Sequence, residues 1–228
     1  MGFLKELWGN YKYYKHVRAT FPNTYKAHYY FPSETIFKYP SKSDFGGVKT
    51  LNLGCGKSVY KAPNVVNLDC IANEGVNIVW DLSKTPLPFE SDSFDLIIAN
   101  HVIEHIPNWF ECMKELARIV KPGGKIEVWI PPVSGDSAFT YRDHINYIGD
   151  ESWSGCETFS RSGTNLAAES MLKSVGEFSK LSVVTRNIRM SLQWWIIFAP
   201  PSIRQFFVDH LRNVVSEVGY TFIKRETI

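Results

Sequence analysis

The segment His101–His105 has residue types and a spacing suited to chemistry, because it reads His-x-x-Glu-His. This is the zinc-binding pattern of one group of metallopeptidases. Zinc binding by this pattern needs a helix that presents both histidines on one face. Here Pro107 disfavours helical geometry at Ile106, and the apolar run Phe94–Asn100 leads directly into His101. We therefore expect no metal ion at this segment. A zinc hydrolase stays an alternative only if metal analysis finds stoichiometric zinc.

The elements that must position these residues are short apolar runs that alternate with helical or turn segments. Such alternation is typical of βαβ units and predicts a parallel sheet. Apolar runs without polar alternation predict strands that are buried on both faces. We predict strands at Val48–Gly54, Val65–Asp69, Val76–Leu82, Phe94–Asn100 and Gly124–Pro132, and a helix within Asn108–Gly124 with Phe110, Met113, Leu116, Ala117 and Val120 on its apolar face.

The carboxyl ends of the predicted strands carry residues that can hold a ligand. Ligands of an open parallel sheet bind just beyond these ends, near the point where the strand order reverses. Gly54 and Gly56 allow a tight turn and a close approach of the backbone. Asp69 is placed to accept hydrogen bonds from both hydroxyls of a ribose, and Asp81 from an exocyclic amine such as that of adenine. A turn or capping role is the alternative for each residue alone, but their order on successive strands predicts a ligand that contains a nucleoside.

The spacing argues against a pyrophosphate in this ligand. A dinucleotide fingerprint needs a third glycine where this sequence has Val59. The short segment between Gly56 and Asp69, which contains Pro63, leaves little room for a long crossover helix. A phosphate-binding loop of the G-x-x-x-x-G-K-[ST] type is also absent from the sequence.

The motifs LNLGCG, VVNLD, DLSKTPLPFESDSFDLIIANHVIEHI and KPGGKIEVWIPP together resemble the class I S-adenosylmethionine-dependent methyltransferases. In particular they are similar to a subgroup with a short segment after the glycine loop, often found near polysaccharide biosynthesis genes. The resemblance covers roughly residues 48 to 132. It implies a Rossmann-like α/β fold, with a mostly parallel seven-stranded sheet flanked by helices. The last strand would be antiparallel, and we expect it in the segment GYTFIKRE.

The resemblance also implies S-adenosyl-L-methionine as cofactor and S-adenosyl-L-homocysteine as product. The glycine loop would pass close to the methionine and adenosine parts, Asp69 would bind the ribose, Asp81 and Leu82 would border the adenine, and His101 would lie beside the sulfonium. The expected cofactor-binding residues are Gly54, Cys55, Gly56, Asp69, Cys70, Asp81, Leu82, Asn100 and His101.

Methyl transfer requires positioning and, where a proton must leave the acceptor, a base. Our candidate catalytic residues are His101, near the methyl donor by the resemblance, and His144, whose ring Asp143 or another carboxylate would orient. Glu104 and His105 are further candidates or braces of the loop. A structural or surface role is the alternative for each histidine.

Segments outside the common core are expected to choose the acceptor. We predict an N-terminal accessory segment at residues 1–46 and a methyltransferase domain at 47–228, in which 133–217 holds acceptor-side or lid elements. The expected acceptor is a small molecule or a saccharide, methylated at oxygen. The aromatic and basic stretch WGNYKYYKHVRATF leaves a protein or RNA acceptor as an alternative, and a catalytically silent cofactor-binding subunit is another.

Composition sets the class of protein. The 228 residues are 44% hydrophobic and 21% charged, with a net charge of +2, which predicts an ordinary globular protein without stable nucleic-acid binding. Four cysteines without a C-x-x-C pair predict free thiols and a cytoplasmic location. The apolar run WWIIFAPP is too short to span a membrane. We expect the surrounding segment to form a lid or a homodimer contact.

Overall fold

The computed structural model describes residues 29–30, 45–153, 180–190, 207, 211–213 and 217–225. The chain divides into two compact units. The smaller unit comprises Met1–Lys38, Pro131–Arg142 and Asn187–Gly219, and the larger one comprises Tyr39–Ile130, Asp143–Arg186 and Tyr220–Ile228. All residues predicted to bind the cofactor or to act in catalysis belong to the larger unit. The predicted boundary near residue 46 and the lid elements stay predictions.

Each predicted strand is present, but the strand predicted at Val76–Leu82 is reduced to the two residues Ile78–Val79. The strand bounds are β2 Thr50–Leu53, β3 Val65–Asp69, β4 Ile78–Val79, β5 Phe94–Asn100, β6 Val120–Ile130, β7 Leu181–Met190 and β8 Glu217–Lys224. The central strand β2 is buried at every position, as expected for a strand covered on both faces. A further short strand, β1 at Tyr29–Tyr30, pairs antiparallel with Arg189 and Met190 in the smaller unit, although we expected no clear strand in the N-terminal zone.

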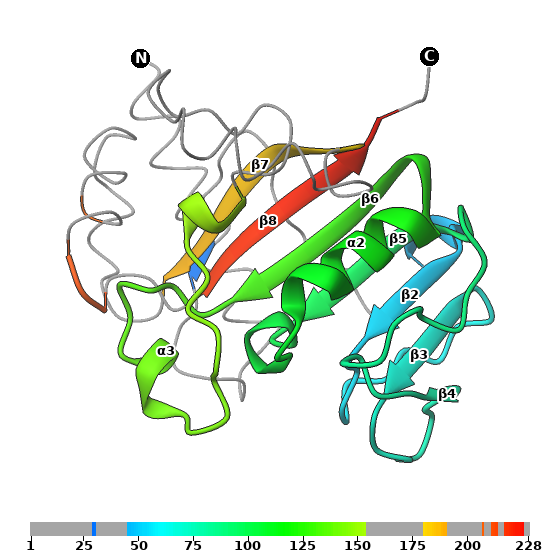
Figure 1. Ribbon diagram of the computed structural model, residues 1–228, viewed down its shortest axis with the longest axis horizontal. Coiled ribbons are helices and arrows are strands. Elements are labelled where there is room, and N and C mark those ends of the chain that lie inside the picture. Colours follow the sequence, from blue (N-terminus) through cyan, green and yellow to red (C-terminus); the bar gives the residue numbers. More distant parts are fainter. Residues whose placement is uncertain are drawn as a thin grey trace. The chain divides into compact units, whose positions relative to one another are not determined.

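The sheet of the larger unit has the strand order β7-β8-β6-β5-β2-β3-β4 (Figure 1). The pairs β2 with β3, β2 with β5, β3 with β4, and β5 with β6 are all parallel. The chain moves outward from β2 through β3 to β4 and then returns to β5 on the other side of β2. The strand order therefore reverses between β2 and β5, where an open parallel sheet binds its ligand.

The last strand runs against its neighbours. The Lys224 ammonium, near the end of β8, donates to the Asp92 carboxylate before β5 at 2.7 Å and to the carbonyl of Val120 at the start of β6 at 2.9 Å. The end of β8 thus lies at the amino-terminal edge of the parallel strands, and the arrow of β8 points opposite to that of β6 (Figure 1). The expected mostly parallel sheet with an antiparallel final strand is confirmed.

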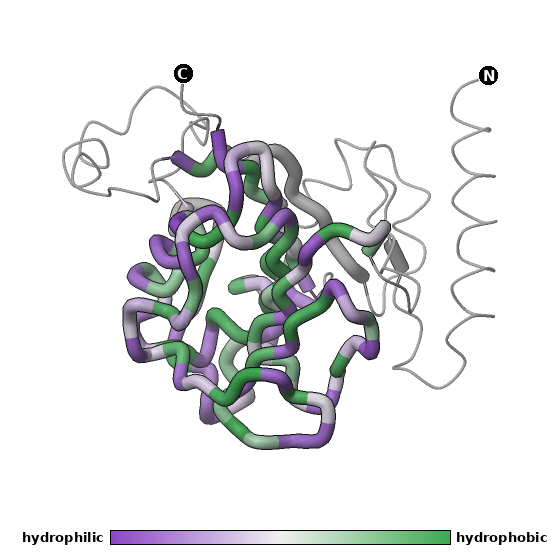
Figure 2. Tube along the Cα trace, turned by 90° about the vertical axis from the view of Figure 1, so that its right-hand side faces the viewer, coloured by the Kyte–Doolittle hydropathy of each residue, from purple (hydrophilic) through white to green (hydrophobic). Residues whose placement is uncertain are grey.

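The helix α2, Trp109–Ile119, returns the chain from β5 to β6. It buries Cys112, Met113, Leu116, Ala117 and Ile119, whose spacing forms one apolar stripe. It lies within the predicted segment but ends at Ile119, so the prediction that Pro122, Gly123 and Gly124 close this helix is wrong, because these residues already belong to β6. Apolar residues along the central strands form the core, with hydrophilic turns around them (Figure 2).

Four shorter helical turns complete the described elements: η1 Phe45–Gly47, η2 Ile103–His105, α3 Ser137–Thr140 and η3 Asp150–Trp153. Within the described ranges, no helix has the length and apolar character needed to cross a membrane. A helix that the sequence allows near the start of the chain lies outside the described residues, and so does the segment SLQWWIIFAPPSIRQFFVDHL apart from Phe207 and Leu211.

Candidate active site

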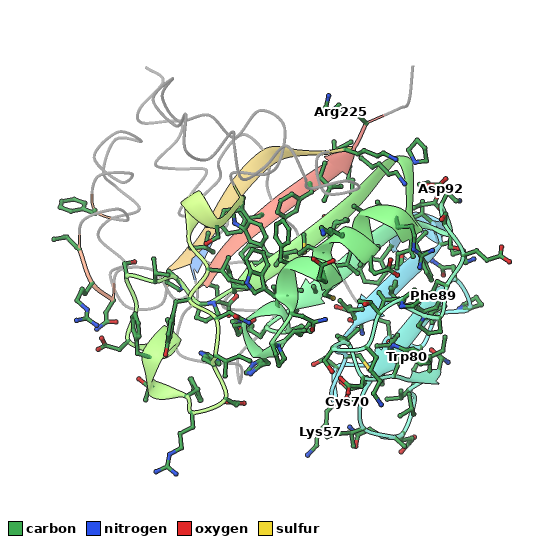
Figure 3. All side chains as sticks on the ribbon, viewed as in Figure 1. Lys57, Cys70, Trp80, Phe89, Asp92 and Arg225 are labelled. Atoms are coloured by element: carbon green, nitrogen blue, oxygen red, sulfur yellow. The ribbon has the colours of Figure 1, made fainter. Side chains whose placement is uncertain are left out.

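The predicted site residues gather at the carboxyl-terminal edge of the parallel strands. Lys57 and Cys70 follow β2 and β3 at this edge, whereas Asp92 precedes β5 at the opposite edge (Figure 3). Asn100 and His101 stand where β5 ends. The sheet therefore brings residues from the ends of three neighbouring strands, β5, β2 and β3, to one edge.

The glycine loop after β2 is shaped by backbone that only glycine adopts easily. Gly54 has a φ of +57°, and a Cβ on it would lie 2.5 Å from a methyl carbon of Val102, so no side chain fits there. Gly56 has a φ of +52°, but its Cβ direction has no atom within 4 Å. The loop is thus held against the turn after β5 at Gly54 and leaves open space at Gly56.

Asp69 closes this loop from the end of β3. Its Oδ2 accepts a hydrogen bond from the backbone N–H of Gly56 at 2.7 Å, and its Oδ1 accepts one from the N–H of Ile71 at 2.9 Å. The residue is 8% exposed. The Cys70 thiol also forms a hydrogen bond with this carboxylate.

A buried asparagine network, which the sequence reasoning missed, holds the short crossover between β2 and β3. Asn67 Oδ1 accepts from Asn52 Nδ2 and from the backbone N–H of Tyr60, both at 3.0 Å, and Asn67 Nδ2 donates to the Tyr60 carbonyl at 2.9 Å. Asn77 Oδ1 accepts from the backbone N–H of Asn67 at 2.7 Å. Polar residues inside otherwise apolar strand runs were the signal for this network.

Two thiols flank Asp69. Cys55 is buried within the glycine loop and Cys70 is exposed after β3. Burial raises the pKa of both thiols, and the negative charge of Asp69 raises each pKa further. Both cysteines therefore stay in the thiol form at neutral pH and are not nucleophiles here.

The residues that follow β4 form a turn. Asp81 is exposed, and its Oδ1 accepts from the backbone N–H and the hydroxyl of Ser83 at 2.9 and 2.7 Å. These hydrogen bonds lower the pKa of the Asp81 carboxyl. The next residue, Leu82, is buried. Asp81 therefore stabilises a turn, and its contact with an adenine stays a prediction.

His101 begins the turn after β5 in an unusual backbone conformation. Its φ is +54°, and its N–H donates to the carbonyl of Trp129 at 2.8 Å. Its ring Nδ1 lies 3.0 Å from Oε1 of Glu104, with the histidine side chain 36% and the glutamate side chain 1% exposed. His101 is therefore outside any helix, and η2 is a single 3₁₀ turn, so the helical zinc-peptidase geometry is not formed.

His144, the second candidate base, lies beside a different histidine. The rings of His105 and His144 are 4.8 Å apart between centroids. Asp143, expected to orient His144, lies instead beside His105, with Oδ2 at 3.4 Å from His105 Nδ1. The structure thus pairs His101 with Glu104 and His105 with His144.

Comparison with known proteins agrees with this arrangement. Residues 51–128 match the family profile described as "Methyltransferase domain". An uncharacterized methyltransferase of Mycobacterium tuberculosis is 28% identical over 148 residues, which cover 59% of this chain and 56% of the relative. A sterol 4-C-methyltransferase of Caenorhabditis elegans is 32% identical over 104 residues, covering 36% of this chain and 30% of the relative. The chain thus spans about half the length of the first relative and less of the second.

Among solved structures, an S-adenosylmethionine-dependent methyltransferase from Mesorhizobium loti is similar with a TM-score of 0.47 and 14% identity, covering 78% of this chain and 91% of that one.

Proposed function

Because residues 51–128 match a methyltransferase domain, we propose that this protein is a class I S-adenosylmethionine-dependent enzyme that methylates a small-molecule or saccharide acceptor at oxygen. The observation that supports this most is the buried Asp69 carboxylate, held by two backbone N–H groups beside an open glycine loop at the point where strand order reverses. S-adenosylmethionine supplies an electrophilic methyl group with its own leaving group.

The residues at this edge fit that cofactor. The open space beside Gly56 leaves room for a ligand close to the backbone, since a Cβ there would meet no atom within 4 Å. Each oxygen of the Asp69 carboxylate can accept more than one hydrogen bond, which suits the two hydroxyls of a ribose. Asn100 ends β5, at the same edge. We propose that the nine residues named from the sequence line this cofactor site.

His101 is the proposed general base. Its Nδ1 lies 3.0 Å from Oε1 of Glu104, and in the tautomer in which Nδ1 donates to this oxygen, Nε2 carries the lone pair. A carboxylate that orients an imidazole in this way fixes the tautomer needed for proton abstraction. The ring is about one-third exposed, which lets an acceptor hydroxyl reach Nε2. In this proposal, Nε2 of His101 takes the acceptor's proton as its oxygen attacks the methyl group.

The proposal is tested by calorimetric titration with S-adenosylhomocysteine. We expect micromolar binding to the wild type and a loss of about 10- to 100-fold in Asp69→Asn, the range for losing a charge-assisted hydrogen-bond pair. Asp95→Asn is the matched control, because it removes the same charge from the opposite edge of the sheet, where Asp95 pairs with Lys121. Equal weakening in both variants, or no binding to the wild type, would contradict the site.

A further inference from the structure

The turn after β5 and the segment that follows α3 bring three metal-binding side chains together. Glu104 and His105 belong to η2, and His144 comes from about 40 residues further along the chain. A carboxylate oxygen of Glu104 and one ring nitrogen of each histidine all lie within 4.8 Å of one another. None of these three residues is among those we propose to bind the cofactor.

Main-chain hydrogen bonds hold this cluster in place. The backbone N–H groups of Ile145 and Asn146 both donate to the carbonyl of Glu104 at 3.0 Å. The Asn146 side chain donates to the carbonyl of Ile106 at 2.7 Å and to that of Ile103 at 3.2 Å. These hydrogen bonds join the backbone next to His144 to the turn that contains Glu104. The backbone therefore holds the three side chains close together.

The buried carboxylate of Glu104 would be stabilised by a positively charged partner. Its side chain is 1% exposed. One carboxylate oxygen, Oε1, faces His101, but the other, Oε2, is buried without a hydrogen-bond partner among the residues the structure describes. A buried carboxylate oxygen without a donor or a cation is unfavourable, because it has lost its contacts with water and gained no partner. The orphaned oxygen belongs to the same side chain that approaches both histidines.

His105 shows the tautomer of a metal ligand. Its Nδ1 lies 3.0 Å from the backbone carbonyl of Asp143. A carbonyl oxygen only accepts, so Nδ1 is the donor, and Nε2 of the neutral ring keeps its lone pair. Metal-binding histidines are commonly fixed in this way, with the other ring N–H donated to a carbonyl or carboxylate. His105 is thus prepared to donate its Nε2 lone pair.

We propose that Glu104, His105 and His144 bind one divalent transition-metal ion. Two imidazoles and one carboxylate form a ligand set that suits Zn²⁺, Fe²⁺ or Mn²⁺ and leaves coordination positions open. A metal–ligand distance of about 2.1 Å places ligand atoms roughly 3.4 Å apart, so the side chains close by about 1 Å on binding.

This site differs from the zinc peptidase considered from the sequence. That pattern uses two histidines from one helix as ligands. Here His101 is not a ligand, and its Nδ1 contacts Oε1 of Glu104. The ligand that replaces it, His144, is remote in sequence. The proposal therefore revises our expectation of no metal at this segment.

The place of the cluster gives the ion a role, and this step rests on the proposed function. Val102, whose methyl groups fill the space beside Gly54, lies between His101 and Ile103 on the same turn. The turn that carries Glu104 and His105 thus also contacts the cofactor loop through Val102, and an open coordination position of a bound ion could bind an acceptor oxygen. A bound ion would lower the pKa of that hydroxyl, and Nε2 of His101 would then accept its proton. The acceptor class that fits is an alcohol.

Metal binding is testable without cofactor or acceptor. After chelator treatment and dialysis, the full chain is titrated with Mn²⁺ and with Zn²⁺, and bound metal is measured by elemental analysis. We expect one equivalent to bind, with at least tenfold weaker binding in Glu104→Gln and in His144→Ala. Asp95→Asn, at the opposite edge of the sheet, should bind as the wild type does.

Because Glu104 is buried, its variant can fail to fold, so His144→Ala decides the outcome together with a thermal melt that verifies folding. Absence of a stoichiometric ion from the folded wild type would overturn the proposal, and so would equal affinity in His144→Ala. S-adenosylhomocysteine binding is measured separately on the same samples. Loss of that binding alone would overturn the proposed function and leave the metal site standing.

Discussion

The cofactor loop and the turn after β5 lie at the same edge of the sheet but are built in different ways. The loop, residues 54–69, uses two positive-φ glycines and one carboxylate, and the hydrogen bond that closes it spans 13 residues of sequence. The turn region, residues 101–105 with 143–146, uses side chains that titrate or bind metals and joins segments about 40 residues apart. The cofactor loop is thus built mainly from backbone groups, and the turn region is built from side chains that titrate or bind metals.

This difference suggests a division of labour. Backbone N–H groups and a fixed carboxylate hold a ligand of constant shape, because they do not change position or charge easily. Imidazoles and a second carboxylate suit proton transfer and metal binding, because their protonation and coordination can change. We infer that the loop determines cofactor affinity and the turn determines acceptor chemistry.

The largest expected effect is at the contact that joins the two regions. In Gly54→Ala, a Cβ placed 2.5 Å from Val102 and a φ of +57° should lower the free energy of unfolding by about 4 kcal/mol. Urea unfolding measures this change. Gly56→Ala is the control, because its φ is +52° but its Cβ meets open space, so only the backbone part, about 1 to 2 kcal/mol, should be lost.

The double variant Gly54→Ala/Val102→Ala sharpens this result. Removing the Val102 methyl groups should recover part of the loss, which a double-mutant cycle would record as a coupling energy. Strict additivity of the two substitutions would show that the loop and the turn are not packed as described.

Glu127 on β6 should make the free energy of unfolding depend on pH by up to about 3 kcal/mol. Burial raises the pKa of Glu127 on β6 from 4.5 to about 7. Between pH 4.5 and 7 the folded chain therefore keeps a proton that the unfolded chain releases, so the free energy of unfolding falls as pH rises through this window. Denaturant melts at pH 5 and pH 8 measure it. In Glu127→Gln this contribution should disappear, and an unchanged pH dependence would assign the effect to other groups.

The asparagine network should support the cofactor loop more than the turn. Asn67→Leu leaves the Tyr60 N–H and Asn52 Nδ2 without their shared acceptor, which should destabilise the fold by about 2 kcal/mol and weaken S-adenosylhomocysteine binding. Val66→Leu, at the neighbouring half-buried position, is the control. Wild-type cofactor affinity in a folded Asn67→Leu variant would separate the network from the loop's function.

The smallest effect is expected at Asp81. Because it is exposed and bonded to Ser83, Asp81→Asn should keep the turn and weaken S-adenosylhomocysteine binding by less than tenfold, well below the effect of Asp69→Asn. Titration calorimetry compares the two variants directly. An equal or larger loss in Asp81→Asn would move the main cofactor contact to the end of β4.

The sequence predicted the first region well because its signals are local. The apolar runs predicted β3 and β5 with their observed bounds. The glycines and Asp69 were identified because they lie at the ends of predicted strands. The sequence also indicated that the segment after the glycine loop has little room for a long crossover helix, since the segment to Asp69 is short and contains Pro63. The described residues there form turns.

The second region was predicted less well because its contacts are not local. Nothing in the spacing of His144 indicated that hydrogen bonds from Ile145 and Asn146 to Glu104 would bring it beside His105. Likewise, the pairing of Asp143 with His105 instead of His144 depends on how the two segments dock. The early start of β6 was missed because Pro122 and two glycines were interpreted as the end of the preceding helix, whereas here they lie within the strand, where its register with β5 shifts.

A crossed titration tests the division between the two regions most directly. S-adenosylhomocysteine and Mn²⁺ are each titrated into the wild type, Asp69→Asn and His144→Ala. The result predicted is that Asp69→Asn loses about 10- to 100-fold in nucleoside affinity and keeps its metal affinity, while His144→Ala shows the reverse. Unchanged nucleoside affinity in Asp69→Asn would contradict the assignment of the cofactor site to the carboxyl ends of β2 and β3.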